Sequence, residues 1–189
     1  MTRPRIVSKR RDRDGYIKVD VVTLQGPDGE TIRREVEDHG RSACVLPYDP
    51  ARKVAMLVSM ARTPLLLAGE ADDLLEAPAG MLDAGESAEA AVRREAMEET
   101  GLALTAVEPV AVVWPSPGVS AETSALFLAP YGQSDRVGEG GGLASEHEGI
   151  TVREVPLGEL RRLAEGGALR DLKTLALVLA LIARRPELF

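Results

Sequence analysis

Apolar runs separated by turn-forming residues divide the chain into short segments with the periods of strands and helices. Strands are predicted over residues 16–24, 31–36, 43–47, 54–59, 107–113, 123–129 and 150–155, with an extended segment over 73–77. Helices are predicted over residues 87–101, near 157–164 and over 172–184. Because strands and helices are mixed along the chain, the pattern predicts an α/β fold in which helices cover a sheet on both sides.

The first two predicted strands flank the turn sequence Gly26-Pro27-Asp28-Gly29 and therefore form a hairpin. A two-stranded unit is marginally stable in water, so we expect it to pack on the main domain or on a partner chain. Residues 1–14 are basic and no apolar signal core follows them, which predicts a solvated N-terminal strand or tail. We therefore divide the chain into an N-terminal β-strand region, residues 1–37, and a main domain, residues 38–189.

An unbroken apolar run of nine residues, 175–183, is well short of the roughly 20 residues needed to cross a bilayer. It predicts a buried helix, with Asp171 as its N-terminal cap and with Arg184 and Arg185 beside its C-terminal end. Because the run is apolar on all sides, we expect the core or a second subunit to cover it. The run therefore predicts no membrane partner.

One predicted helix carries carboxylates where an amphipathic helix normally buries hydrocarbon. Ser87 can cap its start, and Gly101 can end it in a left-handed turn. At about 100° per residue, Glu95, Glu98 and Glu99 fall on or beside the apolar stripe formed by Ala88, Ala91, Val92 and Ala96. Like charges at neighbouring helix positions repel, and partial burial raises that cost. A bound cation is the usual remedy, so the pattern predicts a metal site.

An alternative interpretation is an acid-rich, solvated helix laced by Arg93 and Arg94. The register favours the metal site, because Arg94 projects to the helix flank, where it can reach back to Glu86 and brace the preceding loop, 80–85. That placement leaves the three clustered acids short of cationic partners. Closely spaced oxygen ligands without Cys or His favour magnesium or manganese over zinc.

Composition and charge are compatible with a globular protein that acts on an anionic substrate through a metal. The 189 residues suit one domain with a small appendage, and 44% of them are hydrophobic, enough for a packed core. The net charge of −7 argues against nucleic acid as a partner, and an anionic substrate needs local arginines or metal to approach.

Cys44 is the only cysteine, which excludes an intramolecular disulfide and fits a cytoplasmic location. Cys44 is interpreted as a residue of the core. His39 and His147 are interpreted as surface or satisfied polar groups.

The segment 80–102, GMLDAGESAEAAVRREAMEETGL, matches the Nudix box, Gly-x5-Glu-x7-Arg-Glu-U-x-Glu-Glu-x-Gly-U, in which U is a bulky aliphatic residue. Every position that specifies one residue is filled, although Ala96 is smaller than the usual aliphatic. The chain therefore resembles the Nudix hydrolase family. The resemblance implies an α/β/α sandwich with a mixed sheet and a Mg²⁺ cofactor, with Mn²⁺ as a possible substitute.

The resemblance also implies roles for the residues of the box. Glu95, Glu99 and the carbonyl of Ala79 hold the metal, and Glu98 adds a ligand or orients bound water. Glu95, Glu98 and Glu99 are therefore expected to be catalytic residues. Gly80, Glu86 and Arg94 are expected to support the loop before the helix. The metal neutralises a diphosphate and activates the nucleophile.

The glycine-rich segment 132–149 is too long for a tight connection, and loops of this size are often functional or mobile. Taken alone, it favours a disordered acidic loop. Its Glu146-His147-Glu148 is similar to a Glu-x-Glu of the nucleoside-diphosphate-sugar pyrophosphatases, a Nudix subgroup that includes hydrolases of ADP-ribose. This resemblance implies that Glu146 positions or deprotonates the attacking water and that Glu148 assists a metal.

Other segments resemble the same subgroup and imply contacts with the substrate. Pro117 and Gly118, in Ser116-Pro117-Gly118, are expected to wall the nucleotide cleft, with a plain surface turn as the alternative. Trp114 is expected either to meet the base or to lie in the core. Where relatives often read Arg-Gln-aromatic-Arg, this chain has Ser59-Met60-Ala61-Arg62 and keeps only the last arginine. The remaining substrate contacts are assigned to Arg34, Arg62 and Glu76, the arginines being suited to a diphosphate.

The resemblance as a whole implies a hydrolase that splits the diphosphate of a nucleoside diphosphate sugar into a nucleoside monophosphate and a sugar 1-phosphate. GDP-mannose is the favoured substrate and ADP-ribose the next. The resemblance also implies a homodimer whose N-terminal strands exchange and whose clefts use both chains. The alternatives are a non-catalytic Nudix-like module that senses a nucleotide, against which the complete carboxylate set argues, and a pure assembly protein.

Overall fold

The computed structural model describes residues 3–70, 73–143 and 149–189, which cluster into two compact units. The smaller unit comprises Met1–Arg41 and Val113–Ser124, and the larger comprises Ser42–Val112 and Ala125–Phe189. The division of the chain at residue 37 remains a prediction.

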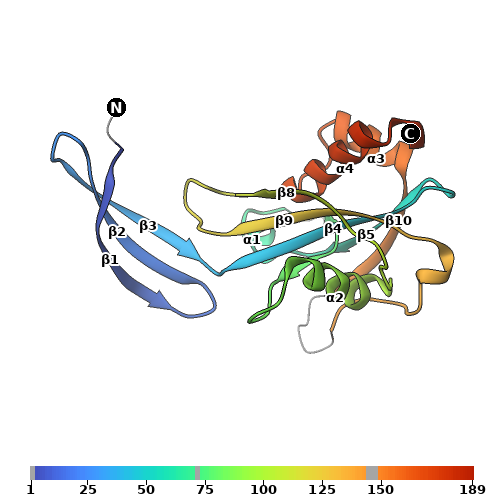
Figure 1. Cartoon of the computed structure of the whole chain (residues 1–189), viewed down its shortest axis with the longest axis horizontal. Helices are drawn as coiled ribbons and strands as arrows, with labels where there is room; N and C mark the ends of the chain where they lie inside the picture. Colours follow the sequence, from blue (N-terminus) through green and yellow to red (C-terminus); the bar gives the residue numbers. More distant parts are fainter. Residues whose placement is uncertain (1–2, 71–72, 144–148) are drawn as a thin grey trace. The chain divides into compact units, whose positions relative to one another are not determined.

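Three antiparallel strands form the sheet of the smaller unit, namely β1 (Arg5–Asp14), β2 (Lys18–Gln25) and β3 (Thr31–Asp38) (Figure 1). The predicted hairpin is confirmed as β2 and β3, and the basic N-terminal residues add β1 to it. Asp20 of β2 is buried and is paired with Lys9 at 2.7 Å and with Arg11 at 2.6 Å. The hydrogen bond from Arg11, followed by that from Lys9, lowers the pKa of Asp20. Part of the basic strand therefore pairs with an acid of its own sheet.

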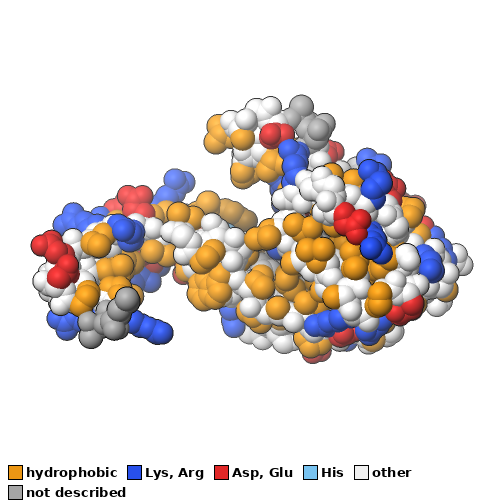
Figure 2. Space-filling model, turned by 90° about the horizontal axis from the view of Figure 1, so that it is seen from above, with side chains coloured by type: hydrophobic (Ala, Val, Ile, Leu, Met, Phe, Trp, Pro, Cys, Tyr) orange, Lys and Arg blue, Asp and Glu red, His pale blue; other side chains and the backbone are white. Residues whose placement is uncertain are grey.

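Apolar side chains remain exposed on this small sheet. Ile6, Tyr16 and Ile32 are 68%, 89% and 45% exposed, respectively. Figure 2 shows hydrophobic side chains among charged ones on the visible face of this part of the chain. Val22 is one of its few buried hydrophobic residues, so three strands alone give the unit little core.

The larger unit is built on a seven-stranded sheet with the order β10-β5-β4-β9-β8, in which β6 pairs with β5 and β7 pairs with β4. Its strands are β4 (Arg41–Asp49), β5 (Val54–Met60), β6 (Leu74–Glu76), β7 (Ala79–Met81), β8 (Glu108–Val113), β9 (Thr123–Pro130) and β10 (Thr151–Pro156). Its α-helices are α1 (Thr63–Leu67), α2 (Ala88–Thr100), α3 (Leu157–Glu165) and α4 (Leu172–Arg184), and two short 3-10 turns are η1 (Gln133–Asp135) and η2 (Pro186–Leu188). Figure 1 shows α2 on one face of the sheet and α3 with α4 on the other. The predicted layered α/β architecture is confirmed.

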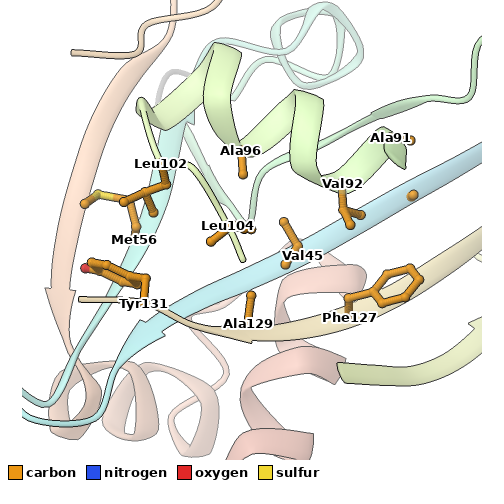
Figure 3. Close-up of a cluster of buried hydrophobic side chains, with 11 residues drawn as sticks. Val45, Met56, Ala91, Val92, Ala96, Leu102, Leu104, Phe127, Ala129 and Tyr131 are labelled. Carbon is orange, nitrogen blue, oxygen red and sulfur yellow. The ribbon is translucent and has the colours of Figure 1, made fainter. Parts of the chain in front are cut away.

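The core lies on both faces of the central strand β4, which is buried along almost its whole length. Val45 packs with Val92 and Ala96 of α2 in the cluster drawn in Figure 3, to which β9 adds Phe127 and Ala129. Cys44 alternates with these positions, points to the opposite face and is fully buried. Burial raises the pKa of its thiol, so Cys44 is a core residue, as expected.

Three local features differ from the sequence-based expectations. Helix α1 was not predicted, and none of its residues is buried. The segment expected to be loop from residue 80 onward begins instead as β7, whose Gly80 lies opposite Ala43 of β4. The core covers helix α4 only in part, because Leu172 and Leu179 are about half exposed, and the alternative of cover by a second subunit remains a prediction. Within the described residues, no helix combines the length and the apolar character needed to span a bilayer.

Candidate functional site

Helix α2 begins and ends where local capping signals place it. The Ser87 hydroxyl accepts a hydrogen bond from the amide of Ala90 at 3.2 Å, and Gly101 ends the helix with a φ of 72°. The amide of Gly101 donates to the carbonyl of Met97 at 2.9 Å. The predicted start and end of this helix are therefore confirmed.

The register of α2 places carboxylates on its buried side. Glu95 is 9% exposed and Glu99 is 4% exposed, while Glu98 is partly exposed beside them. Ala91, Val92 and Ala96 anchor the helix to the sheet on the same side. The acids thus lie at the edge of the apolar stripe rather than in open solvent, as the 3.6-residue period predicts.

Strand β7 runs directly against two of these carboxylates. At Gly80, a Cβ atom would lie 1.7 Å from Oε1 of Glu95, so only glycine allows this close approach. The neighbouring amide of Ala79 donates a hydrogen bond to Oε2 of Glu99 at 3.2 Å. Two consecutive residues of β7 therefore determine where Glu95 and Glu99 lie.

Arg94 binds several carboxylates at once. Its guanidinium donates two hydrogen bonds to Glu86, from Nε to Oε1 at 3.1 Å and from Nη2 to Oε2 at 3.0 Å. Nη2 also donates to the carbonyl of Met81 at 3.0 Å. Nη1 of Arg94 donates to the carboxylate of Glu95 at 2.7 Å and to that of Glu98 at 3.2 Å. The link to Glu86 was foreseen, whereas the two bonds to the helix acids were not. Arg94 therefore joins the loop, β7 and the carboxylate cluster.

The electrostatics of this cluster favour an additional cation. The hydrogen bonds from Arg94, followed by the amide of Asp83, lower the pKa of Glu86 and keep it ionised. One guanidinium thus serves Glu86, Glu95 and Glu98, and Glu99 adds a further buried carboxylate. Several carboxylates are therefore crowded into a partly buried site, and such crowding is costly unless positive charge offsets it.

The donors present fit a hard divalent cation. The side chains of Glu95, Glu98 and Glu99 offer carboxylate oxygens, which suit magnesium or manganese. Among the described residues, no three carboxylate, imidazole or thiol groups already converge tightly enough to enclose an ion. Arg94 engages Glu95 and Glu98 instead, so a metal would have to share these oxygens with the guanidinium.

Arg62 and Glu76, both assigned to the substrate, lie together in the larger unit. Nε and Nη2 of Arg62 donate to the two carboxylate oxygens of Glu76 at 2.6 and 3.1 Å. Glu76 is buried, with 3% of its surface exposed. Lys173 of α4 lies 3.9 Å from the same carboxylate and 2.7 Å from Asp171. Burial would raise the pKa of Asp171, but the charge and hydrogen bond of Lys173 outweigh it and lower that pKa.

The same network connects α4 to the segment that leads into β7. Asp171 caps α4 by accepting a hydrogen bond from the amide of Thr174 at 2.8 Å, as expected from the sequence. The Thr174 hydroxyl in turn accepts the amide of Ala77 at 2.7 Å. This connection, two residues before Ala79, was not anticipated, because it joins residues about a hundred positions apart.

The other substrate candidates belong to the smaller unit. Trp114 is 56% exposed, so the alternative that it is a core residue is wrong for this chain. Pro117 and Gly118 lie in an exposed turn, and the exposed Arg34 of β3 donates to the carbonyl of Arg33 at 3.0 Å. Glu146, His147 and Glu148 lie outside the described residues, and their assigned roles remain predictions.

The turn that contains Pro117 and Gly118 is tied to the end of β3. The amide of Glu37 donates to the carbonyl of Val119 at 2.9 Å, and the amide of Ala121 donates to the carbonyl of Glu37 at 2.8 Å. His39 Nδ1 is hydrogen-bonded to the Glu37 side chain, and its Nε2 lies 3.5 Å from Glu122. His39 is thus a paired polar group, as expected, although its partners were not foreseen.

Comparisons with known proteins show the family and the fold. A protein-family model described as "NUDIX domain" matches residues 38–178. GDP-mannose pyrophosphatase of Cronobacter sakazakii (strain ATCC BAA-894) is 41% identical over 158 residues, covering 82% of this chain and 81% of that protein. GDP-mannose pyrophosphatase of Escherichia coli O1:K1 / APEC is 36% identical over 170 residues, covering 87% of each chain. A solved structure described as "Crystal structure of ADP compounds hydrolase" is similar in fold, with a TM-score of 0.79 and 17% identity over 99% of this chain and 96% of that chain.

Proposed function

We propose that this chain, which belongs to the Nudix hydrolase family, hydrolyses the diphosphate bond of a nucleoside diphosphate sugar. The products are a nucleoside monophosphate and a sugar 1-phosphate. GDP-mannose is the first expected substrate, which the similarity to two GDP-mannose pyrophosphatases supports, and ADP-ribose is the next. The observation that carries the proposal is the cluster of Glu95, Glu98 and Glu99, which lies against β7 and shares the guanidinium of Arg94.

The metal proposed for this site is Mg²⁺, with Mn²⁺ as a substitute. Glu95, Glu98, Glu99 and the carbonyl of Ala79 are the residues that would hold it, with Glu148 as an additional ligand. Such an ion neutralises the charge of a diphosphate and lowers the pKa of bound water. The carboxylate oxygens and their crowding around one face of α2 support this choice.

The protein's own groups hold the carboxylates in place for this chemistry. The Ala79 amide orients Glu99, and Arg94 orients Glu95 and Glu98 while its bonds to Glu86 fix the loop. These contacts restrict the rotamers of groups that must face one reacting centre, which is how preorganisation lowers a barrier. Glu146 is proposed to position or deprotonate the attacking water.

Recognition of the nucleotide sugar is assigned to six residues, each of which is a prediction from the sequence. Trp114 is exposed enough for its indole to stack on a base, and Pro117 with Gly118 would wall the same region. Arg34 and Arg62 are proposed to contact the diphosphate. Glu76 is proposed to orient Arg62, with which it forms two hydrogen bonds, and to accept a sugar hydroxyl.

We also propose a cytoplasmic homodimer that exchanges its N-terminal strands. The exposed apolar residues Ile6, Tyr16 and Ile32 on a sheet with little core support a partner for this region. A second copy that contributes to the cleft would cover them. Sedimentation of the full chain against a chain lacking residues 1–37 tests the assembly, with a monomeric full chain as the contradicting result.

The competing function is a non-catalytic module that senses a nucleotide. A sensor needs to bind a nucleotide but has no use for a set of carboxylates that is complete for hydrolysis. Incubation with GDP-mannose, ADP-ribose, other nucleotide sugars and dinucleotides plus Mg²⁺ separates the two functions. Tight binding without turnover of any compound favours the sensor, and turnover of dinucleotides alone contradicts the proposed substrate class.

Glu99→Gln provides the matching test of the site. The substitution keeps the shape of the side chain but removes its charge, so turnover should fall by about two orders of magnitude or more while the fold persists. Glu89→Gln is the control, because Glu89 is an exposed residue in the first turn of the same helix. Nearly normal turnover by Glu99→Gln would contradict the metal assignment.

A further inference from the structure

The C-terminal end of α2 leaves backbone carbonyls that the helix itself cannot pair. The amides of Gly101 and Leu102 close the last turn on the carbonyls of Met97 and Ala96, at 2.9 and 3.2 Å. The carbonyls of Glu98 and Glu99 lie beyond these bonds. They belong to the same residues whose side chains form the carboxylate cluster.

A glycine-rich segment about forty residues downstream pairs these carbonyls. The amide of Gly142 donates to the carbonyl of Glu98 at 3.0 Å, and the amide of Gly141 donates to that of Glu99 at 2.8 Å. The amide of Gly138 donates to the carbonyl of Gly101 at 3.2 Å. We call residues 138–142 the glycine cap. Its N–H groups face the negative end of the helix dipole, where the carboxylates already concentrate negative charge.

The glycine cap and the end of α2 pack backbone against backbone, and two of their glycines have no room for a side chain. At Gly140, where φ is +74°, a Cβ would lie 2.4 Å from the carbonyl oxygen of Glu99 and 2.6 Å from Cα of Thr100. At Gly101, a Cβ would lie 2.2 Å from the carbonyl oxygen of Gly138. Because these obstacles are backbone atoms, no rotamer change can relieve them. Adding a methyl group at Gly140 must therefore displace either the glycine cap or the last turn of α2.

We propose that the glycine cap is a positioning element for the metal-binding carboxylates. It holds the last turn of α2, and hence Glu98 and Glu99, at the spacing at which the ion is bound. This inference rests on the proposed function, because it assumes that these two glutamates bind metal. The glycine cap is therefore a positioning element, which acts through the last turn of α2.

The test compares two glycines with the same backbone conformation and different surroundings. Gly140→Ala introduces both the left-handed strain and the backbone clash, whereas Gly167→Ala introduces only the strain, since φ there is +73° and nothing lies within 4 Å. Mn²⁺ affinity is measured directly by titration calorimetry, and turnover is measured against Mg²⁺ concentration. For Gly140→Ala we expect affinity to fall about tenfold or more and saturating kcat to fall about 10². Gly167→Ala should match the wild type in both.

Two results would overturn the proposal. One is a folded Gly140→Ala protein with wild-type Mn²⁺ affinity, and the other is an equal loss of affinity in Gly167→Ala. Calorimetry does not depend on turnover, so it separates this inference from the proposed function, which fails if the wild type turns over no nucleotide sugar.

A measurement on the wild type covers the case in which Gly140→Ala does not fold. Hydrogen exchange at the amides of Gly141 and Gly142 should slow several-fold when Mg²⁺ is added, because metal binding to Glu98 and Glu99 stabilises the turn that these amides cap. Exchange that is unchanged by saturating Mg²⁺ would contradict coupling between the glycine cap and the metal.

Discussion

Gly80→Ala is the most direct test of the geometry that places Glu95. The added methyl carbon would lie 1.7 Å from Oε1, 2.2 Å from Cδ and 2.8 Å from Oε2 of that carboxylate. Gly80 is not among the glycines with positive φ, so alanine brings no left-handed strain. The substitution therefore acts first through the clash with Glu95, whose three atoms are the nearest obstacles.

The size of the effect follows from the displacement that is required. Non-bonded carbon contacts begin near 3.5 Å, so the oxygen must retreat by roughly 1.5–2 Å. Glu95 is 9% exposed and its Oε1 is bonded to Arg94 at 2.7 Å, so this movement breaks a charged hydrogen bond. Because metal ligands tolerate only about 0.2 Å and a misplacement of about 1 Å can cost 10²-fold in rate, we expect kcat/KM to fall about 10²–10³-fold.

The assay measures kcat/KM on GDP-mannose with saturating Mg²⁺, together with unfolding in urea. Unfolding should show a loss of about 1–3 kcal/mol, the range for a charged hydrogen bond. Gly158→Ala is the control, because a Cβ at Gly158 meets nothing within 4 Å. If Glu95→Ala is introduced first, Gly80→Ala should cost almost no further stability, since the obstructing carboxylate is gone. Activity within twofold of the wild type, or an undiminished stability cost in the Glu95→Ala background, would refute this reasoning.

Three further predictions follow from other contacts. The pKa of Glu86 is lowered in the folded state, so ionised Glu86 stabilises the fold above its ordinary pKa, and this stabilisation is lost as the pH falls through the lowered pKa. The melting temperature between pH 6 and 3 should therefore decline less steeply for Glu86→Gln than for the wild type. Arg62→Ala leaves buried Glu76 with Lys173 at 3.9 Å, and should cost about 2 kcal/mol in urea unfolding, whereas a neutral result would show that Lys173 suffices. Trp114 is the only tryptophan and is exposed, so binding of GDP-mannose should quench the protein's fluorescence. Trp114→Ala should raise KM several-fold and leave kcat unchanged, and an unchanged KM would exclude stacking of the base on Trp114.

Local signals in the sequence predict α2 well and α1 not at all. Ser87 and Gly101 act on their own neighbours, and the 3.6-residue period alone decides that Glu95 and Glu99 face inward. Helix α1 has only five residues, with a proline in its first turn and no buried side chain, so no amphipathic period exists to reveal it. The sequence therefore predicts the helix that carries the site but not every element around it.

Contacts between distant parts of the chain explain what the sequence could not predict at the site. The ion pair of Arg94 with Glu98 is an i,i+4 contact within one helix, whereas the bond of Arg94 to the carbonyl of Met81 depends on how β7 docks against that helix. Strand β7 in turn exists because Gly80 pairs with Ala43 in β4, a partner nearly forty positions earlier. A composition rich in glycine likewise marks residues 138–142 without revealing that they cap α2.

Helices α2 and α4 show how far the site departs from ordinary helix design. Helix α4 carries Arg184 in its last turn, where a cation complements the negative end of the dipole, and Arg184 also pairs with Glu108 at 2.6 Å. The last turn of α2 has no basic residue and instead holds Glu98 and Glu99. This arrangement opposes the dipole and crowds like charges, so it lowers the stability of the isolated helix. Arg94 and the amides of the glycine cap offset only part of that cost. The proposed divalent cation would offset more, and functional sites commonly give up stability in this way.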